Sequence, residues 1–135
     1  NHLGNNMTDP ISDLLIRLKN GSDVKREIVS VPYSNLRNAT LEALLKIGFI
    51  KSVVKKPKKV GAELLVGLAY EGGKAKIKGV KRISKPSKRV YMGVKDIKKV
   101  KEGYGAMLFS TPKGILADKE ARKELVGGEA MFKIW

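Results

Sequence analysis

The sequence predicts an α/β (α+β) protein of two small lobes, an N-terminal α-β-α-β-β lobe and a C-terminal lobe that is mostly β with one short helix. Three observations support this fold class. Apolar residues recur at helical spacing near the start of the chain, they alternate with polar residues in later segments, and a Glu71-Gly72-Gly73 tract interrupts both patterns. With 135 residues, 42% of them hydrophobic, the chain can bury a core without disulfides or a metal.

The expected division places the N-terminal lobe at residues 7–71 and the C-terminal lobe at residues 74–135. Residues 1–6 are expected to be the remnant of an expression tag ahead of a native start at Met7. We therefore leave them out of the functional interpretation.

The first predicted element is a helix. Thr8 or Asp9 can cap it, Pro10 suits its first turn and Gly21 ends it. Its buried face is predicted from apolar residues at the i, i+3, i+4, i+7 spacing, which are Ile11, Leu14, Leu15 and Leu18.

The rest of the N-terminal lobe alternates strands with one more helix. A strand at 28–31 stops at Pro32, and Ser34 then caps a helix over 35–47 that Gly48 closes. Strands at 49–54 and 62–70 form a hairpin around a basic turn at 55–59.

The C-terminal lobe is predicted from short alternating segments separated by turns. Asp118 can cap a short helix that runs through Leu125 and faces inward with Ala121, Leu125 and Val126. The other expected elements are a strand at 75–80 with one basic side, a loop at 85–88, a strand at 89–92, one or two helical turns at 94–101, a tight passage at 103–105, strands at 106–109 and 115–117 around a turn at 110–114, and a final strand at 129–135.

Positive charge dominates the composition. The chain holds 28 Lys and Arg against 13 Asp and Glu, which gives a net charge of +15. Residues 72–135 carry 17 basic and 6 acidic residues, and the stretch from Lys74 to Lys101 carries twelve basic residues and one acid, Asp96. A surface of this kind attracts polyanions and indicates nucleic-acid binding, although a solvated basic face without a partner is the alternative.

Several function classes lack the residues they need. There are no cysteines, and the only histidine, His2, lies in the expected tag, so no disulfide framework, thiolate metal site or histidine-based catalytic site is expected. Gly103-Tyr104-Gly105 is an incomplete dinucleotide motif, and no Walker loop is present. No apolar run approaches the roughly 20 residues of a membrane span. We expect a soluble, cytoplasmic, monomeric protein that is not an enzyme and needs no cofactor.

An ordered series of short motifs resembles one family. It runs from Thr8-Asp9-Pro10-Ile11-Ser12-Asp13 through residues 81–91, Gly103-Tyr104-Gly105 and Ser110-Thr111-Pro112-Lys113-Gly114 to Gly127-Gly128-Glu129. In order and spacing these motifs resemble the bacterial ribosomal protein numbered eighth in the small subunit. The resemblance implies binding to the central domain of 16S rRNA during assembly, contacts with neighbouring small-subunit proteins and, in some members, repression of the protein's own operon mRNA.

The loop at 110–114 is the first candidate for RNA contact. Hydroxyls and a lysine can reach 2′-hydroxyls, base edges and phosphates, although an ordinary hydroxyl-rich turn is the local alternative. The resemblance favours the RNA interpretation, because this loop matches the family's RNA-contacting segment. The candidates in it are Ser110, Thr111, Lys113 and Gly114.

Two more C-terminal segments add candidates. Tyr91 can stack on an unpaired base while Arg89 holds a phosphate, or Tyr91 can be a core residue. Glu129, next to Gly128, can accept hydrogen bonds from base amino groups, or it can pair with Lys113 or Arg122. Tyr104 is a secondary candidate. The loop at 85–88 adds two cations, Lys85 and Lys88.

The N-terminal lobe supplies a second group of candidates. Thr8 and Asp9 are read first as helix caps, and a helix N-terminus is also a natural phosphate site. The other candidates lie off the buried stripe of the first helix or at the start of the second, and are Arg17, Asn20, Asn35 and Arg37. The lysines at 55–59 suit non-specific phosphate contact or plain solvation.

A nucleoid or membrane-surface protein that binds by charge alone is the alternative function, and a hydrolase is a distant third.

Overall fold

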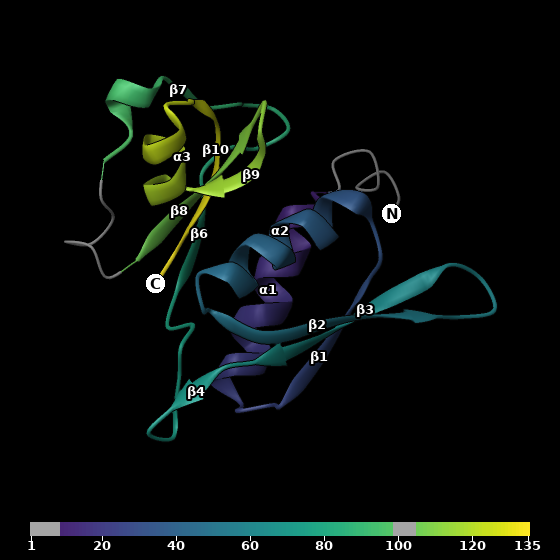
Figure 1. The fold of residues 1–135 in the computed structure, drawn as a ribbon. Coiled ribbons are helices and arrows are strands. Elements are labelled where there is room, and N and C mark those ends of the chain that lie inside the picture. The colour runs from purple at the N-terminus through teal and green to yellow at the C-terminus, as the bar shows by residue number, and fades with distance from the viewer. Residues whose placement is uncertain (1–8, 99–104) are drawn as a thin grey trace.

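The computed structural model describes residues 9–98 and 105–135 (Figure 1). Within these residues no helix is long and apolar enough to cross a membrane. The N-terminal lobe contains α1 (Pro10–Asp23), β1 (Ile28–Pro32), α2 (Asn35–Lys46), β2 (Ile50–Pro57) and β3 (Ala62–Leu68). The C-terminal lobe contains β6 (Val80–Arg82), β7 (Tyr91–Met92), the 3-10 turn η2 (Val94–Asp96), β8 (Ala106–Thr111), β9 (Gly114–Ala117), α3 (Asp118–Glu124) and β10 (Gly128–Ile134). The predicted α+β class and the order of elements are confirmed.

The N-terminal lobe is a three-stranded antiparallel sheet of order β1-β3-β2 with both helices on one face (Figure 1). Alternation along the central strand explains this arrangement, because Leu64, Val66 and Leu68 are all buried beneath the helices. The predicted stripe of α1 supplies the opposing apolar surface, with Leu14 and Leu18 fully buried. The two expected helix caps, Asp9 and Ser34, are confirmed.

Helix α1 continues two residues beyond Gly21, where the sequence predicted its end. Close packing of α1 against the sheet, and not the end of the helix, explains why residue 21 is a glycine. A Cβ at Gly21 would lie 2.4 Å from Cγ1 of Val29 and 3.1 Å from Cδ1 of Leu68. Only a residue without a side chain therefore lets α1 approach the sheet at this point.

The predicted basic turn at 55–59 is wrong, because most of it is strand. Main-chain pairing between β2 and β3 continues to Pro57 opposite Ala62, and the turn lies at 58–61, where the Lys58 N–H donates to the Gly61 carbonyl at 3.1 Å. Ladder hydrogen bonds join backbone groups, so a run of exposed lysines does not end them. The result is a basic ribbon that projects away from the helices (Figure 1).

The expected boundary at 71–73 is a tight hairpin. Strands β4 (Tyr70–Glu71) and β5 (Lys74–Ala75) pair around Gly72 and Gly73, whose φ angles of +59° and +78° suit a two-residue turn. The predicted continuous strand at 75–80 is therefore wrong. Beyond β5 the chain crosses to the second sheet, where a Cβ at Gly79 would lie 2.5 Å from the ring of Trp135.

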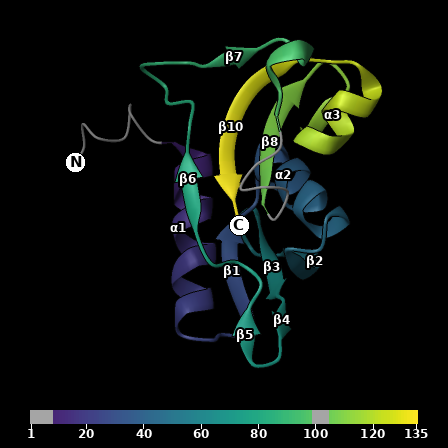
Figure 2. The same ribbon diagram turned by 90° about the vertical axis from the view of Figure 1, so that its left-hand side faces the viewer.

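Strand β10 is the centre of the C-terminal lobe (Figure 2). It pairs with β7 and β6 along one edge and with β8 along the other, and β9 continues the sheet beyond β8. Side chains of β8 alternate between two apolar clusters. Leu108 joins the large cluster shared with α1, α2 and the N-terminal sheet, whereas Phe109 joins a smaller cluster with Ala121 and Ala130. The two lobes therefore share one continuous core, and the second cluster closes the opposite face of the sheet.

The short helix differs from expectation at both ends. Ala117 occupies the N-cap position of α3, and the Asp118 carboxylate instead accepts the Met107 N–H at 3.1 Å and pairs with Arg122. Leu125 was expected to face inward but is 78% exposed, because the helix ends there in a left-handed conformation with φ of +59°. Ala121 is fully buried, as predicted.

Two predicted segments are only partly tested. Of the helical turns expected at 94–101, the 3-10 turn at Val94–Asp96 is present, and residues 99–101 lie outside the described part of the chain. Thr8, Gly103 and Tyr104 lie outside it as well. The strand predicted at 89–92 is shorter than expected, spanning Tyr91–Met92.

An ion pair joins the two lobes at the start of α1. The Arg82 guanidinium, on β6, donates from Nε to Asp9 Oδ2 at 2.8 Å and also reaches the Met131 carbonyl. Asp9 simultaneously accepts the Ile11 N–H at 3.1 Å and the Ser12 hydroxyl at 2.7 Å. Burial would raise the pKa of the Asp9 carboxyl, but the hydrogen bonds from Arg82 and Ser12 and the charge of Arg82 outweigh it and hold the pKa below its ordinary value.

Replacing Gly21 tests the packing explanation. Gly21→Ala should lower the free energy of unfolding by about 1–3 kcal/mol, because the added methyl overpacks the contact with the stiff, buried Val29 side chain. Helix propensity alone predicts the opposite, a gain of about 1 kcal/mol. Urea denaturation decides between them, with the exposed neighbour Asn20→Ala as the control, and a stabilised Gly21→Ala protein would contradict the account.

Replacing Asp9 tests the ion pair. Asp9→Asn keeps a capping acceptor but loses the charge, so at pH 6 the variant should be less stable by about 1–3 kcal/mol. The folded pKa of Asp9 is depressed, so its stabilisation is present above the unfolded-state pKa and is lost as pH falls through the folded pKa. Urea denaturation from pH 6 to pH 2 should show the difference from wild type shrinking below about pH 4. A difference that is constant with pH would refute the assignment.

Candidate nucleic-acid interface

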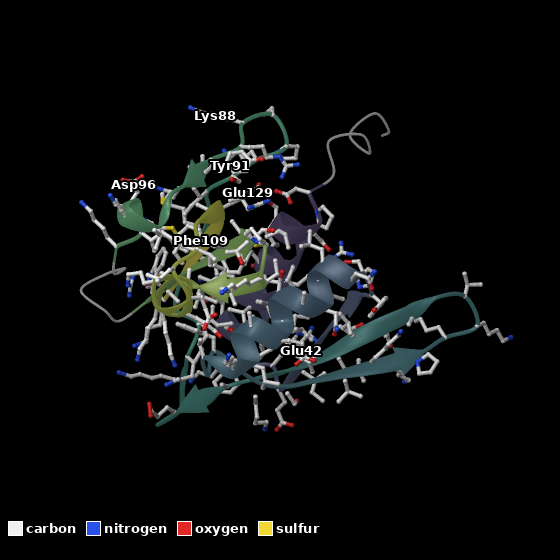
Figure 3. All side chains as sticks on the ribbon, turned by 45° about the horizontal axis from the view of Figure 1, so that its top comes forward. Glu42, Lys88, Tyr91, Asp96, Phe109 and Glu129 are labelled. Carbon is white, nitrogen blue, oxygen red and sulfur yellow. The ribbon has the colours of Figure 1, made fainter. Side chains whose placement is uncertain are left out.

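Three of the predicted site residues lie in one row across three strands. In the register of the sheet, Glu129 on β10 is directly opposite Tyr91 on β7 and also directly opposite Ser110 on β8. Directly opposed residues of antiparallel strands point to the same face of a sheet. Figure 3 labels Tyr91 and Glu129 close together at one end of the lobe. Segments about 20 residues apart in sequence thus form a single Tyr91–Glu129–Ser110 row.

The side chains of this row have complementary properties. Tyr91 is 70% exposed, so the alternative that it is a core residue is wrong. The Glu129 side chain is only 18% exposed and accepts a hydrogen bond from Arg89 Nη1 at 2.9 Å. That hydrogen bond and the charge of Glu129 raise the pKa of Arg89 above its ordinary value. The row therefore offers an aromatic face, a carboxylate held by a cation, and a hydroxyl.

Glu129 does not pair as the alternative interpretation expected. Lys113 lies 3.3 Å from Glu124, and Arg122 lies 3.1 Å from Asp118. The partner of Glu129 is instead Arg89, another predicted site residue. Because a carboxylate has about four lone-pair sites, the Arg89 hydrogen bond orients Glu129 and leaves it able to accept from a ligand.

Two glycines let β10 approach its neighbours closely enough to form the row. A Cβ at Gly128 would lie 2.2 Å from the Ser110 carbonyl oxygen, and a Cβ at Gly127 would lie 2.3 Å from the Met92 carbonyl oxygen. Gly128 was predicted as a site residue, but strand packing alone explains why a glycine occupies this position. It allows the backbone of β10 to place Glu129 beside Ser110.

The turn between β8 and β9 is closed by its own side chain. The Thr111 hydroxyl donates to the Gly114 carbonyl at 2.7 Å and accepts the Lys113 N–H at 3.1 Å. Gly114 has a φ of +111°, a conformation that favours glycine. Thr111 and Gly114 therefore shape the turn, as the hydroxyl-rich-turn alternative expected, and the Lys113 side chain is exposed at its tip.

The N-terminal candidates divide between structural and exposed positions. The Arg37 side chain is only 12% exposed and donates to the carbonyls of Pro10 and Pro32, so it fastens α2 to α1 and β1. Asn35 accepts the Tyr33 hydroxyl at 2.9 Å. Asp9 caps the start of α1 by accepting the Ile11 N–H, and it also accepts a hydrogen bond from Arg82.

Two further candidates on α1 lie apart from the row. Arg17 pairs with Asp13 at 3.1 Å and donates to the Ser30 carbonyl at 3.0 Å, and its side chain remains 44% exposed. Asn20 is exposed but lies roughly 16 Å along the helix from Asp9, at 1.5 Å per residue. Asn20 is therefore not brought together with the Tyr91–Glu129–Ser110 row.

The loop carrying Lys85 and Lys88 is fixed by its backbone. The two residues exchange N–H to carbonyl hydrogen bonds, each 2.9 Å long. Both side chains are exposed, and Figure 3 shows Lys88 pointing outward at the edge of the lobe. These are cations on a rigid loop next to β7.

Sequence reasoning missed the role of Arg82. The residue was part of the quoted 81–91 motif, but nothing in its spacing pointed to Asp9, which lies 73 positions earlier. Because the partner lies on a distant element, no sequence signal could have identified the pair. The described residues hold no group of three His, Cys, Asp or Glu side chains that could bind a metal ion.

Known proteins match this chain over nearly its whole length. The family model described as ribosomal protein S8 matches residues 9–135. The small ribosomal subunit protein uS8 of Mycoplasmopsis synoviae (strain 53) is 46% identical over 130 residues, covering 96% of this chain and 98% of the relative. The uS8 proteins of Mycoplasmopsis agalactiae and Clostridium botulinum (strain Eklund 17B / Type B) are 45% and 43% identical, each over 96% of this chain and 98% of the relative. Matches of this length and identity show that the chain belongs to the ribosomal protein S8 (uS8) family.

Proposed function

We propose that this chain binds the central domain of 16S rRNA through the Tyr91–Glu129–Ser110 row and holds the local RNA structure during assembly of the small subunit. As a uS8 protein it is a structural constituent of the ribosome and not an enzyme, as the sequence predicted.

The observation that supports the proposal is the row itself. An exposed aromatic ring can stack on an unpaired base, and sequence-specific RNA recognition commonly uses such stacking. A carboxylate next to it can accept from base amino groups, which a lysine cannot do. Ser110 adds a hydroxyl able both to donate and to accept at a 2′-hydroxyl. The row therefore supplies recognition chemistry that positive charge alone lacks.

Affinity comes from the cations around the row. Lys85, Lys88 and Arg89 lie in the connection between β6 and β7, and Lys113 lies in the turn between β8 and β9, within a chain of net charge +15. Contacts from such side chains to phosphates release counterions, so they strengthen binding without reading sequence. The C-terminal lobe is therefore proposed as the main RNA-binding region, and Thr8, Arg17 and Asn20 as peripheral contacts.

Two finer assignments follow from the proposed RNA contact. An mRNA element that presents the same shape would compete for the same row, which is how the chain would repress its own operon. Neighbouring small-subunit proteins would contact surfaces that the RNA leaves free. The competing function, a nucleoid or membrane-surface protein that uses charge alone, gives no role to an exposed Tyr91 beside a carboxylate.

A binding titration tests the proposal. At near-physiological salt, the protein should bind the central-domain rRNA hairpin at least about 100-fold more tightly than a scrambled duplex of equal length. Tyr91→Ala and Ser110→Ala should each cost about 1–3 kcal/mol of binding to the hairpin only. Lys59→Ala, on the distant β2–β3 turn, is the matched control and should weaken both RNAs slightly and equally. Equal affinity for both RNAs and for DNA, indifferent to the row, would favour the charge-only function.

A further inference from the structure

A second surface of the C-terminal lobe has a different character from the row. A hollow of about 460 Å³ opens on the sheet, lined by Lys81, Arg82, Ile83, Lys85, Lys88, Val90, Met92, Met107 and Lys133. Alternation along β8 puts Ser110 on the Leu108 face and Met107 on the other face. Lys133 is directly opposite both Met107 and Lys81. The core of the hollow therefore lies on the face that does not carry the Tyr91–Glu129–Ser110 row.

The rim of the hollow is strongly cationic. Lys81 and Lys133 stand directly opposite each other on adjacent strands, and Lys85 and Lys88 form a bridge in the β6–β7 loop. None of these four lysines forms an ion pair within residues 9–98 and 105–135, whereas Arg82 is engaged by Asp9. No acidic residue lines the hollow in this part of the chain. The rim therefore suits an anionic occupant.

The floor is apolar and offers few polar groups. Its side chains are those of Ile83, Val90, Met92 and Met107, of which Met107 is 9% exposed. The Ile83 N–H donates to the Met131 carbonyl, and the Met107 N–H donates to Asp118. Val90 uses both its N–H and its carbonyl within the fold, through Ser84 and Ala130. The floor thus has little capacity to hydrogen-bond a buried ligand.

This combination decides between two anionic occupants. An unpaired nucleotide in the hollow would bury base edges against a mostly apolar floor that has few hydrogen-bonding groups and no aromatic ring to stack on, which is costly. An aliphatic or aromatic side chain of a protein has no such need, and adaptable methionines suit it. We propose that the hollow binds an acidic protein segment in which carboxylates flank one or two apolar side chains.

The identity of the partner as a neighbour in the small subunit rests on the proposed function, whereas the binding of an acidic segment does not. A second copy of the chain is disfavoured as occupant because both copies carry a charge of +15. Lys81 and Lys133 are not among the proposed RNA contacts, whereas Lys85 and Lys88 are proposed for both, so RNA phosphates and an acidic segment would compete for these two lysines.

The test uses a fluorescein-labelled peptide, Asp-Glu-Leu-Phe-Asp-Glu, and fluorescence anisotropy with the full chain. The double variant Lys81→Glu/Lys133→Glu should weaken binding about tenfold, because it removes one side of the cationic rim. Lys55→Glu/Lys56→Glu, on the distant β2–β3 ribbon, makes the same charge change and should alter binding by no more than about twofold. A control peptide, Asp-Glu-Gly-Ser-Asp-Glu, should bind wild type about tenfold more weakly, since it lacks the apolar anchor.

The outcomes separate this proposal from the RNA function. Circular dichroism checks that the variants fold. If Lys81→Glu/Lys133→Glu does not fold, the charge-neutral variant Lys81→Gln/Lys133→Gln is used in its place. Equal losses from both double variants, equal affinity for the two peptides, or no binding to wild type would overturn the proposal. If Lys81→Glu/Lys133→Glu weakened binding of a uridine hexamer and left peptide binding unchanged, the hollow would be assigned to nucleic acid. Binding of the rRNA hairpin to Lys81→Glu/Lys133→Glu reports on the row separately.

Discussion

The position of strand β10 is the constraint on which the rest of the structure depends. It hydrogen-bonds to β6, β7 and β8, and its side chains enter both apolar clusters. The register shifts between Ala130 and Phe132, and Met131 and Phe132 both pack in the large cluster. The main-chain carbonyl of the intervening Met131 accepts from Ile83 and Arg82. This irregularity fixes how the C-terminal sheet meets the N-terminal lobe, because Arg82 also holds Asp9.

Patterns within single elements were predictable from the sequence, and contacts between elements were not. The α1 stripe and the caps Asp9 and Ser34 depend on neighbouring residues alone, so periodicity and side-chain type identified them. Gly21 was assigned as a helix end because its reason, contact with Val29, lies on another element. The C-terminal lobe shows the same limit. The helical spacing predicted that Leu125 faces the core, but the helix ends at this residue and its side chain is exposed.

The candidate site shows the same division. Composition and charge pointed to a polyanion partner, and the motif series pointed to the individual residues, including Tyr91 and Glu129. That Tyr91, Glu129 and Ser110 form one row required the register of three strands. Gly128 is explained by strand spacing alone, because a Cβ there would collide with the Ser110 backbone. Under the proposed function, affinity would be spread over many lysines, whereas recognition would be concentrated in a row of three side chains set on paired strands.

The proposed role of the row can be examined by adding the central-domain rRNA hairpin to the full chain and recording the changes in backbone amide NMR shifts. The largest changes should occur at residues 89–91, at Ser110, Thr111 and Lys113, and at residues 128–129, with the rest of β10 unchanged, because the row is already formed before RNA binds. Changes confined to the β2–β3 ribbon, with Tyr91, Ser110 and Glu129 unaffected, would contradict it. That result would mean that the chain holds RNA by its lysines alone.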